Sequence, residues 1–327
     1  MFTVLIPLYN KAAYIQRALD SVYAQTCQPS EILVVNDGAT DGSDEIVRRQ
    51  GRPLVRVLDQ PNQGVSIARN NGLAAATQPF IAFLDADDCW RPGFLAAMRQ
   101  AIEAFPSATL YGSGFATVAD ARVQREFGIP AGPEGPTAPR EVDFFRVISG
   151  GHPLHMSTTV APREAALAVG GLREGVAFGE DHIFWAELAL RGPVVLTPEI
   201  LADYDVSVPG QAIERWKTAY KERVLEYFRF LAREMRARTG STPLEQSFQA
   251  HGREVLRTAL LQRLYWANFP AIRELWSECG LASLRLGGVA EACSWIARSP
   301  ILQPPAAAGL AAVRGVRRLV RGQAASS

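Results

Sequence analysis

Residues 80–88 read FIAFLDADD, an apolar run that is followed at once by three acidic residues. Three similar apolar runs precede it, at Phe2–Ile6, Ile32–Val35 and Leu54–Leu58. All four are bounded by turn-forming residues, which is typical of buried β-strands. Segments with helical spacing lie between them. This alternation predicts an α/β fold with a mostly parallel, twisted sheet flanked by helices.

The segments of helical period are the second element of this pattern. One apolar stripe runs from Ile15 to Tyr23, and we expect Asn10 to be the N-cap of this helix. Further helices are predicted around Arg163–Val169 and Asp181–Arg191, beyond the FIAFLDADD segment.

Beyond about residue 205 the sequence becomes helical throughout. Apolar residues recur at steps of three and four between Ile213 and Met235, and similar segments follow at 244–264, 271–279 and 289–297. We therefore expect an α/β catalytic domain over residues 1–205 and a helical C-terminal region over residues 206–327. The last part, about 309–327, is basic and amphipathic. It is read either as a contact with an anionic membrane surface or as a solvated, disordered end.

Composition narrows the class of protein. The net charge of +1 over 327 residues gives no electrostatic footprint for nucleic acid. Its four cysteines, Cys27, Cys89, Cys279 and Cys293, show no Cys-x-x-Cys spacing, which argues against a zinc site or a disulfide framework. We see no secretory leader and no apolar stretch long enough to span a bilayer. The expected location is the cytoplasm, with peripheral contact to the inner face of the cytoplasmic membrane through the tail.

Polar motifs follow three of the predicted strands, at Pro7–Asn10, Asn36–Gly38 and Asp85–Asp88. Ligands of open α/β sheets bind at the carboxyl ends of the strands, so these motifs should meet at one edge. Three acidic residues within four repel one another, and a divalent cation such as Mg²⁺ or Mn²⁺ would neutralise them. The alternative is a solvated acidic turn that caps the next helix. Glycine-rich dinucleotide and P-loop motifs and a Gly-x-Ser-x-Gly elbow are absent from the sequence, which argues against those nucleotide-binding and hydrolase classes.

Four segments together carry a family resemblance. Val4–Asn10, Val34–Ser43, Gly64–Asn70 and Phe83–Asp88 closely resemble, in the same order, the successive signatures of family 2 glycosyltransferases. The resemblance implies the GT-A fold, an α/β domain that binds a nucleotide-sugar through a metal ion. It extends more weakly to about residue 205, and the remainder of the chain carries no motif of the family.

The resemblance also implies roles for individual side chains. It places five of them around the donor nucleotide: Pro7, Tyr9, Asp37, Arg69 and Asp85. Asp87 would bind Mn²⁺ or Mg²⁺, with Asp85 and His155 as further candidate ligands. Without the family, Arg69 would be read as a surface charge, Tyr9 as a packed aromatic residue and His155 as a structural histidine.

An acidic pair, Glu180 and Asp181, follows the turn Val169–Leu172. In the family this region supplies a carboxylate that removes the proton of the acceptor hydroxyl during direct, inverting displacement. Asp181 is assigned as that base, and Glu180 as its neighbour and an acceptor ligand. The alternative is that Asp181 only begins the next helix, where an acid suits the helix dipole.

These residues predict an inverting, metal-dependent enzyme of polysaccharide or cell-envelope biosynthesis. It would move one sugar from a nucleoside-diphosphate sugar, expected to be a UDP-sugar, to a hydroxyl of a glycan or lipid-linked acceptor. A processive mechanism is not favoured, because Gln211–Trp216 has one residue too many for the processive motif. A non-catalytic nucleotide-sugar-binding relative with a regulatory or scaffolding role is the alternative, and intact Asp87 and Asp181 speak against it.

Overall fold

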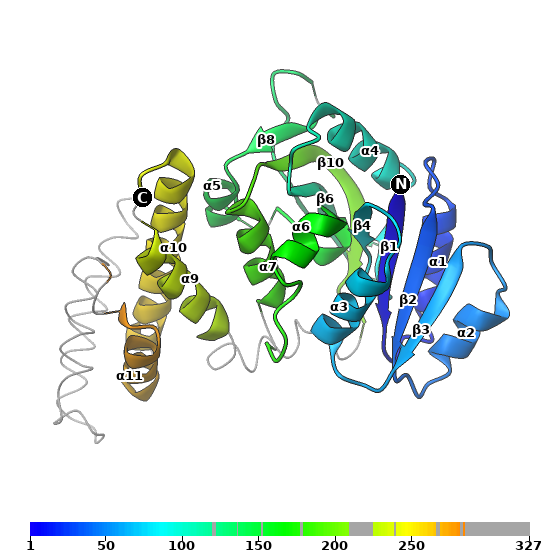
Figure 1. Ribbon diagram of the computed structural model, residues 1–327, viewed down its shortest axis with the longest axis horizontal. Coiled ribbons are helices and arrows are strands. Elements are labelled where there is room, and N and C mark those ends of the chain that lie inside the picture. Colours follow the sequence, from blue (N-terminus) through cyan, green and yellow to red (C-terminus); the bar gives the residue numbers. More distant parts are fainter. Residues whose placement is uncertain are drawn as a thin grey trace. The chain divides into compact units, whose positions relative to one another are not determined.

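The computed structural model describes residues 1–119, 122–135, 137–151, 153–176, 179–208, 225–238, 240–265, 269–281 and 284. The chain divides into two compact units, Met1–Tyr220 and Lys221–Ser327. Figure 1 shows the elements of both units, which are described separately here.

The first half of the sheet in the first unit is parallel. Its four strands are β1 (Phe2–Leu8), β2 (Glu31–Asp37), β3 (Val55–Gln60) and β4 (Phe80–Phe83). They are connected through the helices α1 (Ile15–Tyr23), α2 (Ser43–Arg49) and α3 (Val65–Ala75). β1 pairs in parallel with both β2 and β4, and β2 with β3. All four predicted strands and the first predicted helix are confirmed.

The second half of the sheet is mixed. Its further strands are β5 (Cys89–Trp90), β6 (Leu110–Ala119), β7 (Arg122–Phe127), β8 (Arg140–Val142), β9 (Thr159–Pro162) and β10 (Val194–Asp205). The order β3-β2-β1-β4-β9-β6-β10-β5 places the antiparallel β9 between β4 and β6. β6 and β10 are parallel. β7 pairs antiparallel with β6, and β8 pairs antiparallel with β10. The parallel pairing that we expected is therefore found in the βαβ segment and between β6 and β10, whereas β5, β7, β8 and β9 pair antiparallel.

Helices cover the sheet and bury the apolar faces of its strands. Those of the second half are α4 (Phe94–Ala104), α5 (Phe144–Ser149), α6 (Arg163–Ala168) and α7 (Glu180–Ala189), with a 3₁₀ turn at Met156–Thr158. In β1, Val4 and Ile6 belong to the core cluster that includes Ile15 of α1. Leu5 points to the other face, where a Cβ on Gly72 of α3 would lie only 2.1 Å from its Cδ1. Successive side chains of β1 therefore pack against helices on opposite faces of the sheet.

Asn10 does not cap α1, contrary to the prediction. The helix begins after Tyr14, which has no side-chain capping bond. Asn10 instead has a positive φ of 51°, a conformation that asparagine tolerates better than most residues. Its Oδ1 accepts a hydrogen bond of 2.8 Å from the amide of Thr40, so it links the loops that follow β1 and β2.

In the second unit, the described residues form three helices: α9 (Leu225–Ala237), α10 (Pro243–Tyr265) and α11 (Phe269–Glu278). They correspond to the predicted helical segments 244–264 and 271–279 and to the end of the 213–235 stripe. The predictions for residues 213–224 and 289–297 and for the tail 309–327 lie outside the described residues. None of the helices in the described part has the length and apolar character needed to cross a membrane.

Candidate active site

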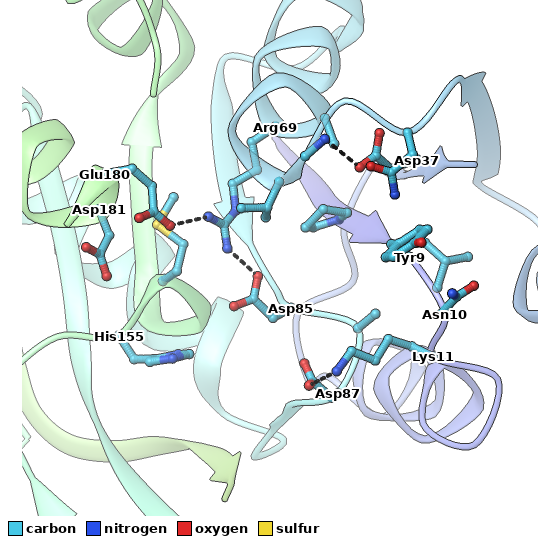
Figure 2. Close-up of a pocket in the computed structure, with 18 of the residues that line it drawn as sticks. Tyr9, Asn10, Lys11, Asp37, Arg69, Asp85, Asp87, His155, Glu180 and Asp181 are labelled. Atoms are coloured by element: carbon cyan, nitrogen blue, oxygen red, sulfur yellow. Dashed lines mark hydrogen bonds and ion pairs between the residues drawn. The ribbon is translucent and has the colours of Figure 1, made fainter. Parts of the chain in front are cut away.

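A cavity of about 600 Å³ lies at the carboxyl ends of the parallel strands in the first unit. It is lined by every site residue that the sequence predicted: Pro7, Tyr9, Asp37, Arg69, Asp85, Asp87, His155, Glu180 and Asp181. In Figure 2, Tyr9 and Asp37 lie on one side of the pocket, Glu180 and Asp181 on the other, and Asp85 between them. Residues more than 170 positions apart in the chain therefore face one space.

Asp37 shapes the side of the pocket formed by β2. Its Oδ1 accepts hydrogen bonds of 2.8 Å from the Gln63 amide and the Gln60 side chain, and its Oδ2 accepts one of 2.9 Å from the Gly64 amide. Gly64 has a φ of 93°, which a side chain would strain. The carboxylate thus fixes the loop before α3. Tyr9 lies on the same side of the pocket (Figure 2), with 47% of its surface exposed.

The Arg69 side chain is buried between two acidic residues and does not lie on the surface. Only 4% of the residue is exposed. Its Nη2 lies 2.5 Å from Asp85 Oδ1, and its Nη1 lies 3.7 Å from Glu180 Oε1. Burial opposes ionisation of Asp85, but the charge of Arg69 outweighs it and lowers the pKa of Asp85. Arg69 therefore joins the turn after β4 to the start of α7.

The turn Asp85–Asp88 is held by contacts to its backbone. Ser157 Oγ donates to the Asp85 amide at 3.1 Å, and Arg17 donates to the Asp87 carbonyl at 2.8 Å. The Asp88 amide donates to the Asp85 carbonyl at 3.1 Å. Because the backbone is fixed in this way, the directions of the three carboxylates are set before any ligand binds.

Asp85, Asp88 and His155 form a group that fits a divalent cation. One ligand atom from each lies within 4.8 Å of the others. Asp88 Oδ1 is buried without a hydrogen-bond partner, which is costly unless a cation approaches it. Hard oxygen ligands with one imidazole suit Mn²⁺ or Mg²⁺. Sequence reasoning overlooked Asp88, although it is the third acid of the same run.

The pKa values of Asp88 and His155 are shifted because both side chains are buried beside other charged groups. Burial and the neighbouring charges of Asp87 and Asp85 raise the pKa of Asp88 well above its usual value. Burial lowers the pKa of His155 despite nearby carboxylates, and a neutral imidazole is the form that binds metal. Its Nδ1 lies 3.3 Å from Asp88 Oδ2.

Asp87, the predicted metal ligand, forms an ion pair. Its Oδ2 lies 2.6 Å from the ammonium of Lys11, and the two side chains are 12% and 22% exposed. Figure 2 shows Lys11 reaching this carboxylate from the loop after β1. Lys11 was also missed by sequence reasoning, although it directly follows the Pro7–Asn10 motif.

The two acids at the start of α7 differ in their pKa values. Burial and repulsion from Asp181 raise the pKa of Glu180 to about 7, with Arg69 opposing. Burial also opposes ionisation of Asp181, but the charge and hydrogen bond of His182 outweigh it and lower its pKa. His182 Nδ1 lies 2.8 Å from Asp181 Oδ1. The pair therefore combines an ionised carboxylate with one that gains a proton near neutral pH.

Comparison with known proteins shows which family the first part of this domain resembles. Residues 3–132 match the model of glycosyl transferase family 2. This segment of the chain is similar to that family. An uncharacterized glycosyltransferase of Nostoc sp., alr2836, is 41% identical over 113 residues, or 34% of this chain and 34% of that protein. The matched segment thus spans about a third of that relative's length.

Solved structures share the fold. The crystal structure of S. aureus TarS 1-349 with UDP-GlcNAc has a TM-score of 0.68 at 21% identity, covering 90% of this chain and 86% of that one. The mannosyltransferase PcManGT from Pyrobaculum calidifontis, with GDP-Man and Mn²⁺, has a TM-score of 0.54 at 22% identity, covering 90% and 84%. The fold is therefore the GT-A fold that the motifs predicted.

A further residue of this domain, which the sequence did not indicate as a site residue, links its two halves. Asn70 of α3 exchanges two hydrogen bonds of 2.8 Å with the backbone of Leu172, in the turn before the acidic pair. Gly171 has a φ of 72°, and a Cβ there would lie 2.3 Å from Asn70 Oδ1. Only glycine fits beside this asparagine, which accounts for Gly171, whereas Gly170 is favoured by its φ of 85°.

Proposed function

We propose that this chain is an inverting, metal-dependent glycosyltransferase that moves a single sugar from a nucleoside-diphosphate sugar to an acceptor hydroxyl. The observation that carries this proposal is the pocket itself. One cavity holds the nucleoside-side residues Tyr9 and Asp37, the carboxylates after β4, and the acidic pair at the start of α7.

A UDP-sugar is the proposed donor. Pro7 and Tyr9 would flank the nucleoside, Asp37 would hydrogen-bond the base, and Arg69 and Asp85 would lie near the ribose. Support comes from the exposure of Tyr9 at the pocket wall, and from TarS, which shares the fold and was solved with UDP-GlcNAc.

Asp87 is proposed to hold Mn²⁺ or Mg²⁺ together with Asp85 and His155. Asp88, which is 1% exposed and does not line the cavity, would orient His155 and take part in the same group. The bound ion would offset the negative charge on the departing diphosphate. The structure of PcManGT with Mn²⁺ supports the choice of metal by its common fold.

Asp181 is proposed as the base. In a direct displacement, the acceptor oxygen forms a bond to the anomeric carbon while the bond from that carbon to the diphosphate oxygen breaks. The hydroxyl proton goes to a carboxylate oxygen of Asp181. Glu180 would bind the acceptor and remain paired with Arg69, which links the acceptor side to the donor side. The acceptor would be a glycan or a lipid-linked sugar, with the tail 309–327 contacting the membrane surface.

The test is nucleotide binding by calorimetry, with and without Mn²⁺, for wild type and Asp87→Asn, together with a panel of nucleotide-sugars assayed for slow donor hydrolysis. We expect UDP affinity to fall by about 10–100-fold when either the metal or the Asp87 carboxylate is removed. Equal affinities would refute the metal assignment, and tighter binding of GDP would refute only the choice of uridine. Absence of transfer and hydrolysis across the whole panel would favour a non-catalytic binding protein.

A further inference from the structure

The ion pair between Lys11 and Asp87 occupies the carboxylate that the proposed metal would need. The other two acids of the run have different partners, since Asp85 pairs with Arg69 and Asp88 accepts from Ser157. Arg17 donates to the Asp87 carbonyl and forms its own ion pair of 2.8 Å with Asp205. Lys11 therefore places an ammonium directly on the Asp87 carboxylate, 2.6 Å from its Oδ2.

Lys11 is anchored at its backbone, while its ammonium contacts Asp87 and lies 5.9 Å from the centroid of the Tyr14 ring. The amides of Tyr14 and Ile15 each donate a hydrogen bond of 2.9 Å to the Lys11 carbonyl. Asn10, just before it, is pinned to Thr40. The flexible four-carbon stem can nevertheless swing within the cavity that Lys11 lines. Arg69, the other strongly basic residue in that lining, is 4% exposed and held between two acids.

The charges of the pocket make the metal and the donor depend on each other. Asp85 and Asp87 are already paired with cations, so a divalent ion alone adds positive charge beside an ammonium. Like charges so close together repel. A diphosphate brings the missing negative charge and offers the displaced ammonium a new partner.

We propose that Lys11 is an internal counter-ion that holds Asp87 until the divalent ion and the donor diphosphate arrive together, and that its ammonium then pairs with the diphosphate. This inference rests on the proposed function, in which Asp87 holds the ion. It makes metal binding weak in the absence of nucleotide and strongly cooperative in its presence. By linkage, the metal must strengthen nucleotide binding by the same factor.

The test measures Mn²⁺ binding to the full chain by electron paramagnetic resonance, without nucleotide and with UDP or GDP. The Mn²⁺ bound by nucleotide in solution is subtracted. Lys11→Met removes the charge and keeps the stem, whereas Lys11→Arg keeps the charge. Arg52→Met removes one positive charge outside the pocket, where Arg52 stacks over Tyr23, and serves as the matched control.

We expect Lys11→Met to bind Mn²⁺ alone about tenfold more tightly than wild type, and the factor by which UDP strengthens Mn²⁺ binding to fall by about tenfold. Lys11→Arg and Arg52→Met should retain the wild-type values. The gain in Lys11→Met should vanish when Asp87→Asn is added. Equal Mn²⁺ affinity of Lys11→Met and wild type without nucleotide would overturn the inference.

Two controls keep the outcomes separate. Thermal unfolding checks that Lys11→Met is folded, and Lys11→Gln replaces it if it is not. If wild type binds neither UDP nor GDP in the presence of Mn²⁺, the proposed function fails, whereas the comparison of Mn²⁺ affinities without nucleotide still decides the role of Lys11.

Discussion

Acidic side chains lie at both ends of the parallel strands, and their surroundings are opposite. At the amino end of β2, Glu31 accepts hydrogen bonds from Thr3, from both the amide and the hydroxyl of Thr77, and from Arg56. Burial opposes its ionisation, yet these bonds lower its pKa to about 2. At the carboxyl ends, Asp88 has a buried oxygen without a partner and a raised pKa, and the pKa of Glu180 is raised to about 7.

The difference separates a structural acid from functional ones. The hydrogen bonds of Glu31 all come from side chains and backbone of the protein itself, so its carboxylate needs no ligand. These bonds connect β1, β2 and the segment before β4. Asp88 and Glu180 at the other end are buried beside other acids and their pKa values are raised, so a bound cation or a transferred proton can stabilise them. The fold therefore holds, at this edge of the sheet, two carboxyl groups that its own side chains do not fully stabilise.

The largest effect should come from Asp181. Asp181→Asn is nearly isosteric but cannot accept a proton, so transfer should fall by about 10²–10⁴-fold. The dissociation constant of the nucleotide should be unchanged, because the contacts to nucleoside and metal lie elsewhere in the pocket. Steady-state transfer rates and calorimetry measure the two quantities. If the variant transfers sugar at the wild-type rate, Asp181 is not the base and Glu180 becomes the candidate.

The raised pKa of Glu180 predicts the shape of the pH profile. Below about pH 7 the acidic pair already holds a proton on Glu180, so it takes up the acceptor proton less readily. Transfer by wild type should therefore rise up to about pH 7 and level off above it, less steeply than tenfold per pH unit because Asp181, the assigned base, stays ionised. Glu180→Gln should abolish this limb, because Asp181 alone has a lowered pKa and stays ionised. A limb that persists in Glu180→Gln would assign the titration to another group.

The sequence predicted the fold and the residues that line the cavity, but not the ion pairs and hydrogen bonds between these residues. Runs such as Phe80–Leu84 and the motifs that follow them are local signals, and the rule that strand ends meet at one edge brought the three strand-end motifs together. Arg69, His155, Glu180 and Asp181, which line the same cavity, were named only through the family resemblance. The ion pair of Lys11 with Asp87 and the bonds of Asn70 to Leu172 join residues 76 and 102 positions apart. No local pattern encodes them. The N-cap assignment of Asn10 failed for the same reason, since its partner Thr40 lies in another loop.

Glu31 gives the first stability test of the comparison. Glu31→Gln removes a charge that accepts several hydrogen bonds, so the free energy of unfolding should fall by about 2 kcal/mol at pH 7. Because the folded pKa of Glu31 is lowered, its contribution is present above the ordinary value of 4.5 and is lost as the pH falls toward 2. Urea unfolding at pH 7 and pH 3 should therefore show a difference that shrinks in acid. Glu103→Gln, on the exposed side of α4, is the control and should change little.

Asp88 should show a smaller effect of the opposite sign. Its folded pKa lies well above its usual value because of burial and the charges of Asp87 and Asp85. The unfolded chain therefore ionises at a lower pH than the folded one, and stability falls as the pH rises above about 4. The asparagine of Asp88→Asn is neutral at every pH and can still accept a hydrogen bond from Ser157. The variant therefore does not lose stability as the pH rises. In EDTA at pH 7 we expect it to raise the free energy of unfolding by about 1 kcal/mol, with the two proteins converging near pH 4. A loss of stability at pH 7 like that of Glu31→Gln would show that Asp88 is a satisfied structural acid, and the contrast between the two ends of the sheet would fail at this residue.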